Sequence, residues 1–440
     1  MAIHTAIRTP ADLAGSGWYE LLPKPAPPRV LEGKRTADWV VIGGGFAGMA
    51  AARRLTQLQP GSRIVVLDAQ RIGWGAAGRN SGFMIDLPHE LASDNYAGGR
   101  DHDIKQIRMN RAAIEFAAGA AAEYGLEPHF IRAGKYHGAA TARGQRVLAE
   151  FEQHLSSLGE PFEKLSADDL RRVTGTSYYA GGTFTPGTVM IQPAAYIRGV
   201  AHGLAEKVEI FENSPVVSIR SGTTHAVSTP QGEVEAPRII LTVNGQVESF
   251  GFFRRRLMHI FLYASMSQKL TSAQIAKLGG ENYWGLIPAD PLGSTVRRFG
   301  DRIVVRNSCT YNPAMQVSDG LVKNFGKAHD RSFDERFPML PGVQAEFRWA
   351  GHLCLSLNSA PAFGEVEQGI YSACCCNGLG TVKGTLYGKL IADLAAGSGE
   401  MMVEEALSGP VPRKLYPEPF MSLGATAKLW WLQKRAGREM

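Results

Sequence analysis

Cysteine is scarce in this sequence, with five residues in a chain of 440. An odd and small number of cysteines does not make a disulfide framework, so a reducing compartment is expected. Cys374, Cys375 and Cys376 are adjacent, and neighbouring side chains on a strand point to opposite faces, so they cannot converge on one metal ion. We expect a buried strand there and predict no metal site.

Long apolar runs are also missing. No segment reaches the roughly 18 uninterrupted apolar residues of a membrane span, so no transmembrane segment is predicted. Residues 1–18 lack the basic, apolar and cleavage regions of a secretory signal, and a cytoplasmic location is therefore expected. The net charge of +6 favours anionic ligands, but the basic residues are scattered, which argues against a nucleic-acid surface.

Glycine, by contrast, is abundant, with 50 residues. The segment 37–70 predicts a strand, a glycine turn, an amphipathic helix and a second strand that ends at Asp68. Gly43, Gly45 and Gly48 allow a tight turn, close approach of a pyrophosphate and close helix–strand packing. Asp68 can accept hydrogen bonds from an adenosine ribose, so this unit predicts a dinucleotide site.

A second glycine-rich stretch, "RIGWGAAGRNSG" at 71–82, follows this unit directly. A nicotinamide dinucleotide seldom needs a second glycine cradle, whereas FAD is longer and bulkier. Gly75, Ala76 and Gly78 let the backbone approach such a cofactor, and Arg79 can neutralise phosphate charge. The sequence therefore predicts FAD as the cofactor.

With these motifs the chain resembles the D-amino-acid oxidase/glycine oxidase superfamily, and within it the γ-glutamylputrescine oxidase-like branch, whose loop reads "RIGxGASGRNGG". The segments "ENSPVVSI", "IILTVNG" and "CNGLGTVKG" are similar to further family marks. The resemblance implies a set of FAD-contacting residues: Gly43, Gly45, Phe46, Ala47, Gly48, Asp68, Ala69, Gly75, Ala76, Gly78, Arg79, Asn80, Ser81, Val216, Gly378, Leu379 and Gly380.

The expected fold class is α/β. A Rossmann-like FAD-binding domain assembled from residues 1–92, 188–248 and 346–440 is interleaved with a substrate domain of residues 93–187 and 249–345. The substrate domain is built on a mostly antiparallel sheet. We expect the flavin at the interface of the two, where clefts for small ligands usually form.

The resemblance implies FAD-dependent oxidation of the C–N bond of a small amine or amino acid, with hydride transfer to flavin N5 and hydrolysis of the imine to a carbonyl. O2 is the expected acceptor. One alternative is a dehydrogenase that passes electrons to a quinone or carrier protein. Another is a non-catalytic FAD-binding subunit or assembly factor, favoured by Leu379 in place of the family histidine and by Ser356 and Asn358 in place of threonine and aspartate.

The catalytic residues are not identified by the sequence. His259 could hold the amine neutral, since histidine titrates near working pH, but a packed histidine is the stronger interpretation. Arg306 could pair with an anionic tail of the substrate, and a surface ion pair is an equal alternative. Gln192, Tyr196 and His352 are comparable candidates for the substrate pocket.

Two further segments leave alternatives open. Relatives of the sarcosine oxidase type carry a flavin-linked cysteine near Cys354, but a small core residue is the favoured interpretation of this thiol. The tail "GATAKLWWLQKRAGR" is a basic amphipathic segment. It is either a membrane-surface anchor or a helix docked on its own domain, and the second is favoured because one short helix binds bilayers weakly.

Overall fold

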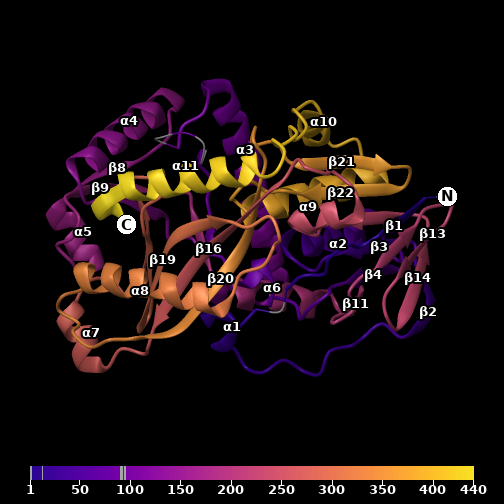
Figure 1. Ribbon diagram of the computed structural model, residues 1–440, viewed down its shortest axis with the longest axis horizontal. Coiled ribbons are helices and arrows are strands. Elements are labelled where there is room, and N and C mark those ends of the chain that lie inside the picture. Colours follow the sequence, from indigo (N-terminus) through magenta and orange to yellow (C-terminus); the bar gives the residue numbers. More distant parts are fainter. Residues whose placement is uncertain (1, 12, 90–92, 94–95) are drawn as a thin grey trace.

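A computed structural model describes residues 2–11, 13–89, 93 and 96–440 of the chain. Two large sheets lie side by side, the six-stranded one in the right-hand half of Figure 1 and the eight-stranded one in the left-hand half. The chain passes between them several times, so each sheet is assembled from separated segments. The predicted α/β class, with a mostly antiparallel second sheet, is confirmed.

The six-stranded sheet has the order β11-β4-β3-β15-β22-β21. Its strands are β3 (Trp39–Ile42), β4 (Ile64–Leu67), β11 (Glu209–Phe211), β15 (Ile239–Leu241), β21 (Ala362–Glu367) and β22 (Ile370–Cys374). In the sheet order, the strands from β11 to β22 pair in parallel, and the edge strand β21 is antiparallel to β22. Parallel strands are buried on both faces, which is why β3 reads "WVVI" without a polar residue.

The two faces of this sheet are covered differently. Val41 and Val66 belong to a core that includes residues of the helices, whereas Val40 and Val65 share a core with the five-stranded sheet. Alternation along each strand produces this division. The helices concerned are α2 (Phe46–Leu58), α3 (Arg100–Tyr124), α6 (Pro193–Leu204) and α9 (Val382–Ala396). The five-stranded sheet consists of β1 (Ile3–Thr5), β2 (Gly33–Thr36), β12 (Ser218–Arg220), β13 (His225–Ser228) and β14 (Gly232–Ala236).

The eight-stranded sheet has the order β20-β16-β19-β18-β17-β7-β9-β8 and is antiparallel except between β17 and β7. Its strands are β7 (Lys135–Ala139), β8 (Glu163–Ser166), β9 (Gly181–Thr185), β16 (Met258–Ser267), β17 (Tyr283–Pro288), β18 (Thr295–Phe299), β19 (Arg302–Tyr311) and β20 (Ala345–Leu355). A small third sheet joins β5 (Phe83–Met84), β10 (Val189–Ile191) and β6 (Phe130–Ile131). The remaining helices are α1 (Gly17–Glu20), α4 (Ala142–Leu158), α5 (Ala167–Thr174), α7 (Ser272–Leu278), α8 (Asp319–Arg336), α10 (Met401–Leu407) and α11 (Phe420–Ala436).

The predicted domain ranges remain a prediction, and residue 92, where the first range ends, lies outside the described residues. All strands of the six-stranded sheet fall in the ranges predicted for the cofactor domain. From that domain's last range, however, β20 joins the eight-stranded sheet and α11 packs on β19. Residues 1–35 contribute the edge strand β1, because Ile3–Thr5 pairs with β12.

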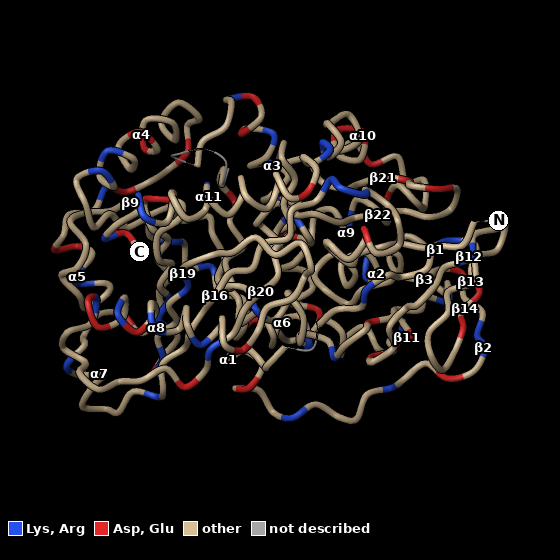
Figure 2. Tube along the Cα trace, in the orientation of Figure 1, with Lys and Arg blue, Asp and Glu red and all other residues tan. Residues whose placement is uncertain are grey.

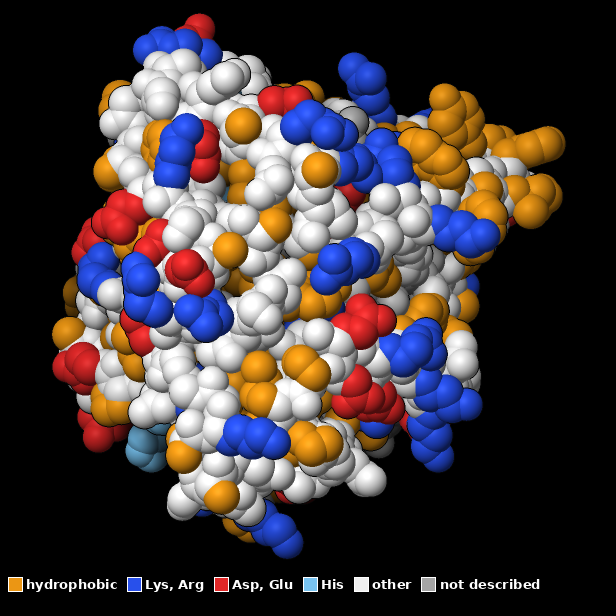
Figure 3. Space-filling model, turned by 90° about the vertical axis from the view of Figure 1, so that its left-hand side faces the viewer, with side chains coloured by type: hydrophobic (Ala, Val, Ile, Leu, Met, Phe, Trp, Pro, Cys, Tyr) orange, Lys and Arg blue, Asp and Glu red, His pale blue; other side chains and the backbone are white. Residues whose placement is uncertain are grey.

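Charge is distributed evenly over the molecule. Figure 2 shows lysine and arginine interspersed with aspartate and glutamate along the whole trace. Figure 3 shows the molecule from its left-hand side, with a group of hydrophobic side chains projecting at the upper right edge, toward which α11 is turned. None of the helices in the described part of the chain has the length and apolar composition that a membrane span requires.

Candidate active site

The first glycine turn connects β3 to α2 without room for side chains. Gly43 has φ +105°, in the left-handed region. A Cβ added to Gly48 would lie 1.8 Å from the carbonyl oxygen of Gly43, so only glycine fits where the helix starts against the strand. Gly45 is the N-cap of α2, and no side chain there caps the first N–H groups of the helix. These groups are available to a phosphate.

Asp68 follows β4 at the same edge of the sheet. Its carboxylate accepts hydrogen bonds from the N–H of Gly44 at 2.7 Å and of Gln70 at 2.8 Å. Burial raises the pKa of this carboxyl to about 6, which leaves it mostly ionised at neutral pH. Asp68 therefore holds the first glycine turn against β4 as well as facing the adjoining cavity.

This first cavity has a volume of about 220 Å³ and extends from the glycine turn to Arg8 in the N-terminal segment and to Val216. It is the place of an adenosine and pyrophosphate in the predicted arrangement. Among its lining residues are the predicted Gly43, Gly45, Asp68, Ala69, Gly75, Ala76, Arg79 and Val216, together with Thr242, Asn244 and His352.

The second glycine-rich loop repeats the steric device of the first. A Cβ added to Gly78 would lie 1.9 Å from the carbonyl oxygen of Gly73, and Gly73 has φ +82°. Arg79 is buried, and its guanidinium donates to the carbonyls of Trp74, Ala350 and Leu13. Arg79 thus fixes the loop to β20 and to the N-terminal segment, with its positive charge beside the cavity.

A second cavity of about 220 Å³ lies between the two large sheets. It shares Gly45, Ala76, Arg79 and His352 with the first cavity, so the two form one elongated cleft. The cleft has bare backbone and a helix N-terminus at one end and apolar side chains at the other, which fits the dinucleotide and ring parts of FAD. The other predicted residues on this second cavity are Phe46, Ala47, Asn80, Ser81, Gly378, Leu379 and Gly380.

Arg306 lies at the end of the cleft formed by the eight-stranded sheet. Its Nη2 donates to Oγ1 of Thr295 at 2.9 Å, and both residues line the cavity. No carboxylate forms an ion pair with Arg306 within the described residues. Burial lowers the pKa of the guanidinium, but an arginine stays charged in proteins. The cleft therefore contains a partly buried cation with spare donors.

His89 is a second polar residue at this end of the cleft. Burial, and then the charges of Lys135, Arg306 and Lys383, lower the pKa of its imidazole to about 3. The ring is neutral at working pH and stacks on Tyr96 at 4.6 Å between centroids. His89 thus adds a polar group to the cavity without adding charge.

His352 and His259 differ in their position relative to the cleft. His352 lines both cavities, whereas His259 is not part of either lining. Nδ1 of His259 lies 3.2 Å from Nε2 of His352, and its own Nε2 lies 3.0 Å from Oε2 of Glu248. Burial and the neighbouring His259 lower the pKa of His352 to about 3, so the ring that faces the cleft is neutral.

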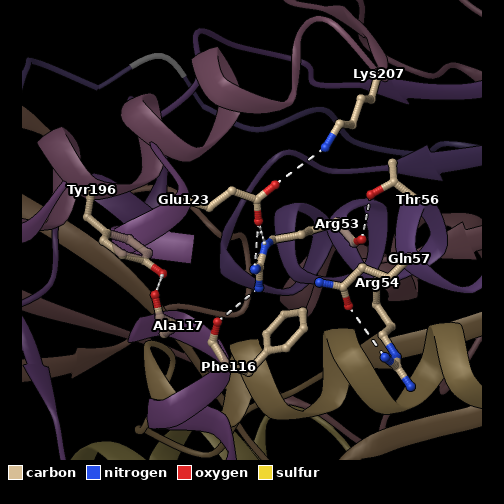
Figure 4. A network of polar contacts seen from close by, with 9 residues as sticks. All are labelled: Arg53, Arg54, Thr56, Gln57, Phe116, Ala117, Glu123, Tyr196 and Lys207. Carbon is tan, nitrogen blue, oxygen red and sulfur yellow. Dashed lines mark hydrogen bonds and ion pairs between the residues drawn. The ribbon is translucent and has the colours of Figure 1, made fainter. Parts of the chain in front are cut away.

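Two other predicted pocket residues lie outside the cleft. The side chain of Gln192 caps α6 through the N–H of Ala195 and donates to the carbonyl of Trp18. The hydroxyl of Tyr196 donates to the carbonyl of Ala117 on α3, beside the junction of α2 and α3 (Figure 4). Both side chains are committed to helix packing, and neither residue is part of the cavity lining.

Figure 4 also shows what holds α2 in place behind the glycine turn. Arg53 on α2 donates through Nε and Nη2 to Glu123 of α3 and through Nη1 to the carbonyl of Phe116. Lys207 approaches the same carboxylate at 3.4 Å. The helix whose N-terminus faces the cleft is therefore anchored near its middle by a half-buried ion pair.

The cysteines gather around the cleft as thiols. Cys354, Cys374 and Cys376 line the second cavity, and all five cysteines are free. Burial raises the pKa of the Cys354 thiol far above its ordinary value, so the nucleophilic thiolate is disfavoured. The predicted buried strand β22 ends at Cys374. Cys375 is buried beyond its end with φ +58°, and Cys376 is half-buried. Across the described residues no group of three or more histidine, cysteine or acidic side chains is arranged to hold a metal ion.

Several cleft residues were not predicted from the sequence. His89, Thr242, Asn244 and Thr295 line the cleft, and Glu248 lies behind it in contact with His259. The pair Thr242 and Asn244 directly follows β15 at the carboxyl edge of the parallel sheet, where ligands of such sheets bind, and this signal could have found them. Glu248 carries no such signal, because only the tertiary structure brings it to His259.

The fold of two large sheets and the elongated cleft between them together define an FAD-binding protein. The family model described as FAD dependent oxidoreductase matches residues 38–394. The chain belongs to this family, so it is an FAD-dependent oxidoreductase, and both the superfamily resemblance and the predicted cofactor are confirmed.

Curated relatives match over most of their length. The chain is 26% identical to a probable oxidoreductase OrdL of Haemophilus influenzae, over 85% of this chain and 86% of the relative. It is also 26% identical to the γ-glutamylputrescine oxidoreductase of Escherichia coli, over 86% of this chain and 88% of the relative.

Solved structures share the fold at lower identity. Glycine oxidase from Geobacillus kaustophilus superposes with a TM-score of 0.70 and 17% identity, covering 83% of this chain and 96% of that one. Iminodiacetate oxidase from Chelativorans sp. BNC1 superposes with a TM-score of 0.66 and 16% identity, covering 85% and 100%.

Proposed function

We propose that this flavoprotein oxidises the C–N bond of a small amine or amino acid that carries an anionic group, and that O2 accepts the electrons. The observation that carries the proposal is Arg306, a partly buried arginine at the far end of the cleft with no carboxylate partner within the described residues. A guanidinium in such a place binds a carboxylate through paired hydrogen bonds. The anionic group of the substrate would complete the site.

The chain's own residues do three things for this reaction. Arg306, held by Thr295, binds and orients the anionic group. Leu262, Ala264 and Ile287 line the same cavity and exclude water from it. When bound, FAD supplies the redox chemistry, taking a hydride at N5 from the carbon beside the neutral amine. Water hydrolyses the resulting imine to a carbonyl and an amine or ammonia.

The names of related proteins support the substrate class. The curated relative from Escherichia coli is named for γ-glutamylputrescine, and the structural neighbours cited above are named for glycine and iminodiacetate. All three compounds have an amine, and each also carries a carboxylate. That combination agrees with a cleft that offers one arginine and an otherwise apolar or neutral surface.

The first experiment mixes the purified flavoprotein anaerobically with matched pairs of amines, such as glycine with methylamine and γ-glutamylputrescine with putrescine. Bleaching of the flavin by the carboxylated member of a pair is expected. Arg306→Gln should raise KM for that substrate about 10- to 100-fold, since a hydrogen bond to a charged group contributes about 1.5–3 kcal/mol. Arg302→Gln is the matched control, because Arg302 lies on the same strand but pairs with Glu346.

Two outcomes would contradict the proposal. If no amine bleaches the flavin, the chain is a non-catalytic FAD-binding subunit or assembly factor. If Arg306→Gln and Arg302→Gln change KM equally, Arg306 does not bind the substrate's anionic group.

The acceptor is tested separately. The lining residues Ala264, Leu379 and Cys374 are nearly inaccessible to solvent, and a small acceptor such as O2 reaches such residues more readily than a carrier protein does. Under air we expect one H2O2 per amine oxidised, because O2 takes up the two electrons. A dye or quinone that is reduced while no peroxide forms would indicate the dehydrogenase instead. The cytoplasmic location also stays a proposal, supported by five cysteines that are all thiols.

A further inference from the structure

Helix α11 is apolar on two opposite faces, which is unusual for a surface helix. Its inner face docks on the eight-stranded sheet with Met421 and Ala436 buried. Gln433 fixes the helix there by accepting a hydrogen bond from the N–H of Cys309 on β19 and donating to its carbonyl. A helix that is apolar all round is normally covered on all sides. This one is covered on one side only.

The outer face presents large hydrophobic side chains to solvent. Phe420, Leu423 and Trp430 follow one another at helical spacing, with exposed fractions of 69%, 67% and 58%. Trp431 beside them is 53% exposed, and Tyr416 precedes the helix on the same chain segment at 70%. The projecting hydrophobic group in Figure 3 lies at the edge toward which this helix is turned. We call Tyr416, Phe420, Leu423, Trp430 and Trp431 the α11 face.

Positive charge accompanies the α11 face. Lys434 lies 4.3 Å from the ring centre of Trp430, and the guanidinium of Arg435 lies 4.8 Å from that of Trp431. Lys428 is exposed on the same helix. The acidic residues of 411–440 are Glu418 and Glu439, and Glu439 is buried in hydrogen bonds with the N–H groups of Ala140 and Thr141. The exposed part of this segment is therefore basic.

The segment is held rigidly in this arrangement. Before the helix, Arg256 and Arg255 donate to the carbonyls of Pro412 and Leu415. At its end, Arg143 donates to the carbonyl of Arg435 at 3.1 Å. The α11 face is thus preformed and loses little conformational entropy when a partner covers it.

We infer that the α11 face docks the protein on an anionic bilayer surface. Tryptophan combines an apolar ring with a polar N–H and is favoured at the boundary between headgroups and acyl chains. Lysine and arginine beside it attract anionic lipid headgroups, and such a helix lies in the plane of the interface. A second copy of the chain fits less well, because a two-fold contact would place the lysines of both copies opposite each other.

The test uses the flavin-loaded full chain and vesicles, and it needs no substrate. Co-sedimentation with vesicles of phosphatidylglycerol and phosphatidylcholine is expected, with little binding to pure phosphatidylcholine. Trp430→Ser/Trp431→Ser should weaken binding at least about 100-fold, since burying each large side chain contributes at least about 1.5 kcal/mol. Lys428→Gln/Lys434→Gln should weaken it about 30-fold, at about 1 kcal/mol per basic residue. Ile7→Ser, at a residue 71% exposed elsewhere on the surface, should bind like the parent.

Other results would overturn the inference. They are no binding of the folded holoprotein to anionic vesicles, equal binding to neutral vesicles, or binding that the tryptophan and lysine variants leave unchanged. An oligomer that the Trp430→Ser/Trp431→Ser variant dissociates, without vesicle binding by the parent, would assign the α11 face to contact between copies of the chain. Each variant's flavin content and thermal midpoint report separately whether the protein is folded.

Discussion

Nε2 of His352 lies 3.2 Å from Nδ1 of His259, and this contact connects the flavin cleft to a carboxylate that the cleft does not contain. The carboxylate of Glu248 can only accept, so Nε2 of His259 carries a proton. If Nδ1 of His259 carries no proton, it accepts from Nε2–H of His352, whose own ring is neutral. The remaining nitrogen of His352, Nδ1, is left as a hydrogen-bond acceptor toward the cleft.

The series of contacts from Glu248 through His259 to His352 predicts that Glu248→Gln weakens FAD binding, although Glu248 does not line the cleft. An amide can donate to His259 as well as accept, so the tautomers of both histidines are no longer fixed. We expect the Kd of FAD to rise about tenfold, corresponding to about 1.4 kcal/mol for one charge-assisted hydrogen bond. Titration of the apoprotein with FAD measures it. Glu346→Gln, at a carboxylate on β20 that pairs with Arg302, is the control, and an unchanged Kd in Glu248→Gln would contradict the prediction.

The two glycine turns predict that a residue larger than glycine does not fit at position 48 or 78. A Cβ on Gly48 or Gly78 would lie within 2 Å of a backbone carbonyl oxygen, closer than any van der Waals contact allows. We expect Gly48→Ala and Gly78→Ala each to lower the flavin content of the purified protein at least about tenfold, since overpacking costs about 1–3 kcal/mol. The ratio of flavin to protein absorbance measures this. Gly320→Ala on α8, where a Cβ would meet only Ser318 Oγ at 3.9 Å, should keep its flavin.

Acid precipitation should release the flavin into solution. The thiol of Cys354 lines the cleft, but burial raises its pKa, and attachment to a flavin requires the thiolate. Colour that stays with the precipitated parent and disappears in Cys354→Ser would reverse this prediction. The same result would show that a bound flavin lowers the pKa of the thiol.

Buried histidines predict loss of stability in mild acid. Burial lowers the pKa of His329 to about 4, below the unfolded value of 6.5. The unfolded chain therefore binds the proton first, and the free energy of unfolding falls as pH decreases from 6.5 toward 4. One such histidine contributes up to about 2 kcal/mol between pH 6.5 and 5.

Urea unfolding at pH 7 and pH 5 measures this loss. In His329→Asn the difference between the two pH values should shrink by about 2 kcal/mol. His102→Asn, at an exposed histidine of α3, should leave the difference unchanged. An equal difference in parent and His329→Asn would show that this histidine does not bind a proton on unfolding in that range.

Local sequence was sufficient for the first half of the site. Gly43, Gly48 and Asp68 fall within one strand–turn–helix–strand unit, and their roles depend on contacts between residues close in the chain. The second loop is similar, because Gly78 meets Gly73 five positions earlier. Such contacts follow from the conformations that glycine allows, so a pattern of residues can reveal them.

The substrate end of the cleft depended on contacts distant in sequence. His259 was one candidate for the substrate pocket, with a packed histidine as the stronger interpretation. The pairing of β16 with β20 places His352 in the cleft and leaves His259 packed behind it. Gln192 and Tyr196 were candidates for the substrate pocket. The orientation of α6 instead directs their side chains to the carbonyls of Trp18 and Ala117. Strand register and helix rotation decide which side chain faces a cavity, and a short sequence motif determines neither of them.

The sequence by itself determined that this protein binds FAD, because the two glycine cradles and the acid after β4 are local arrangements of backbone. Only the tertiary structure decided that Arg306 stands without a carboxylate partner in the described part of the cleft, and that α11 exposes its second apolar face. Burial and partnership are properties of segments brought together from distant parts of the chain. They depend on what covers a residue and not on its neighbours in sequence.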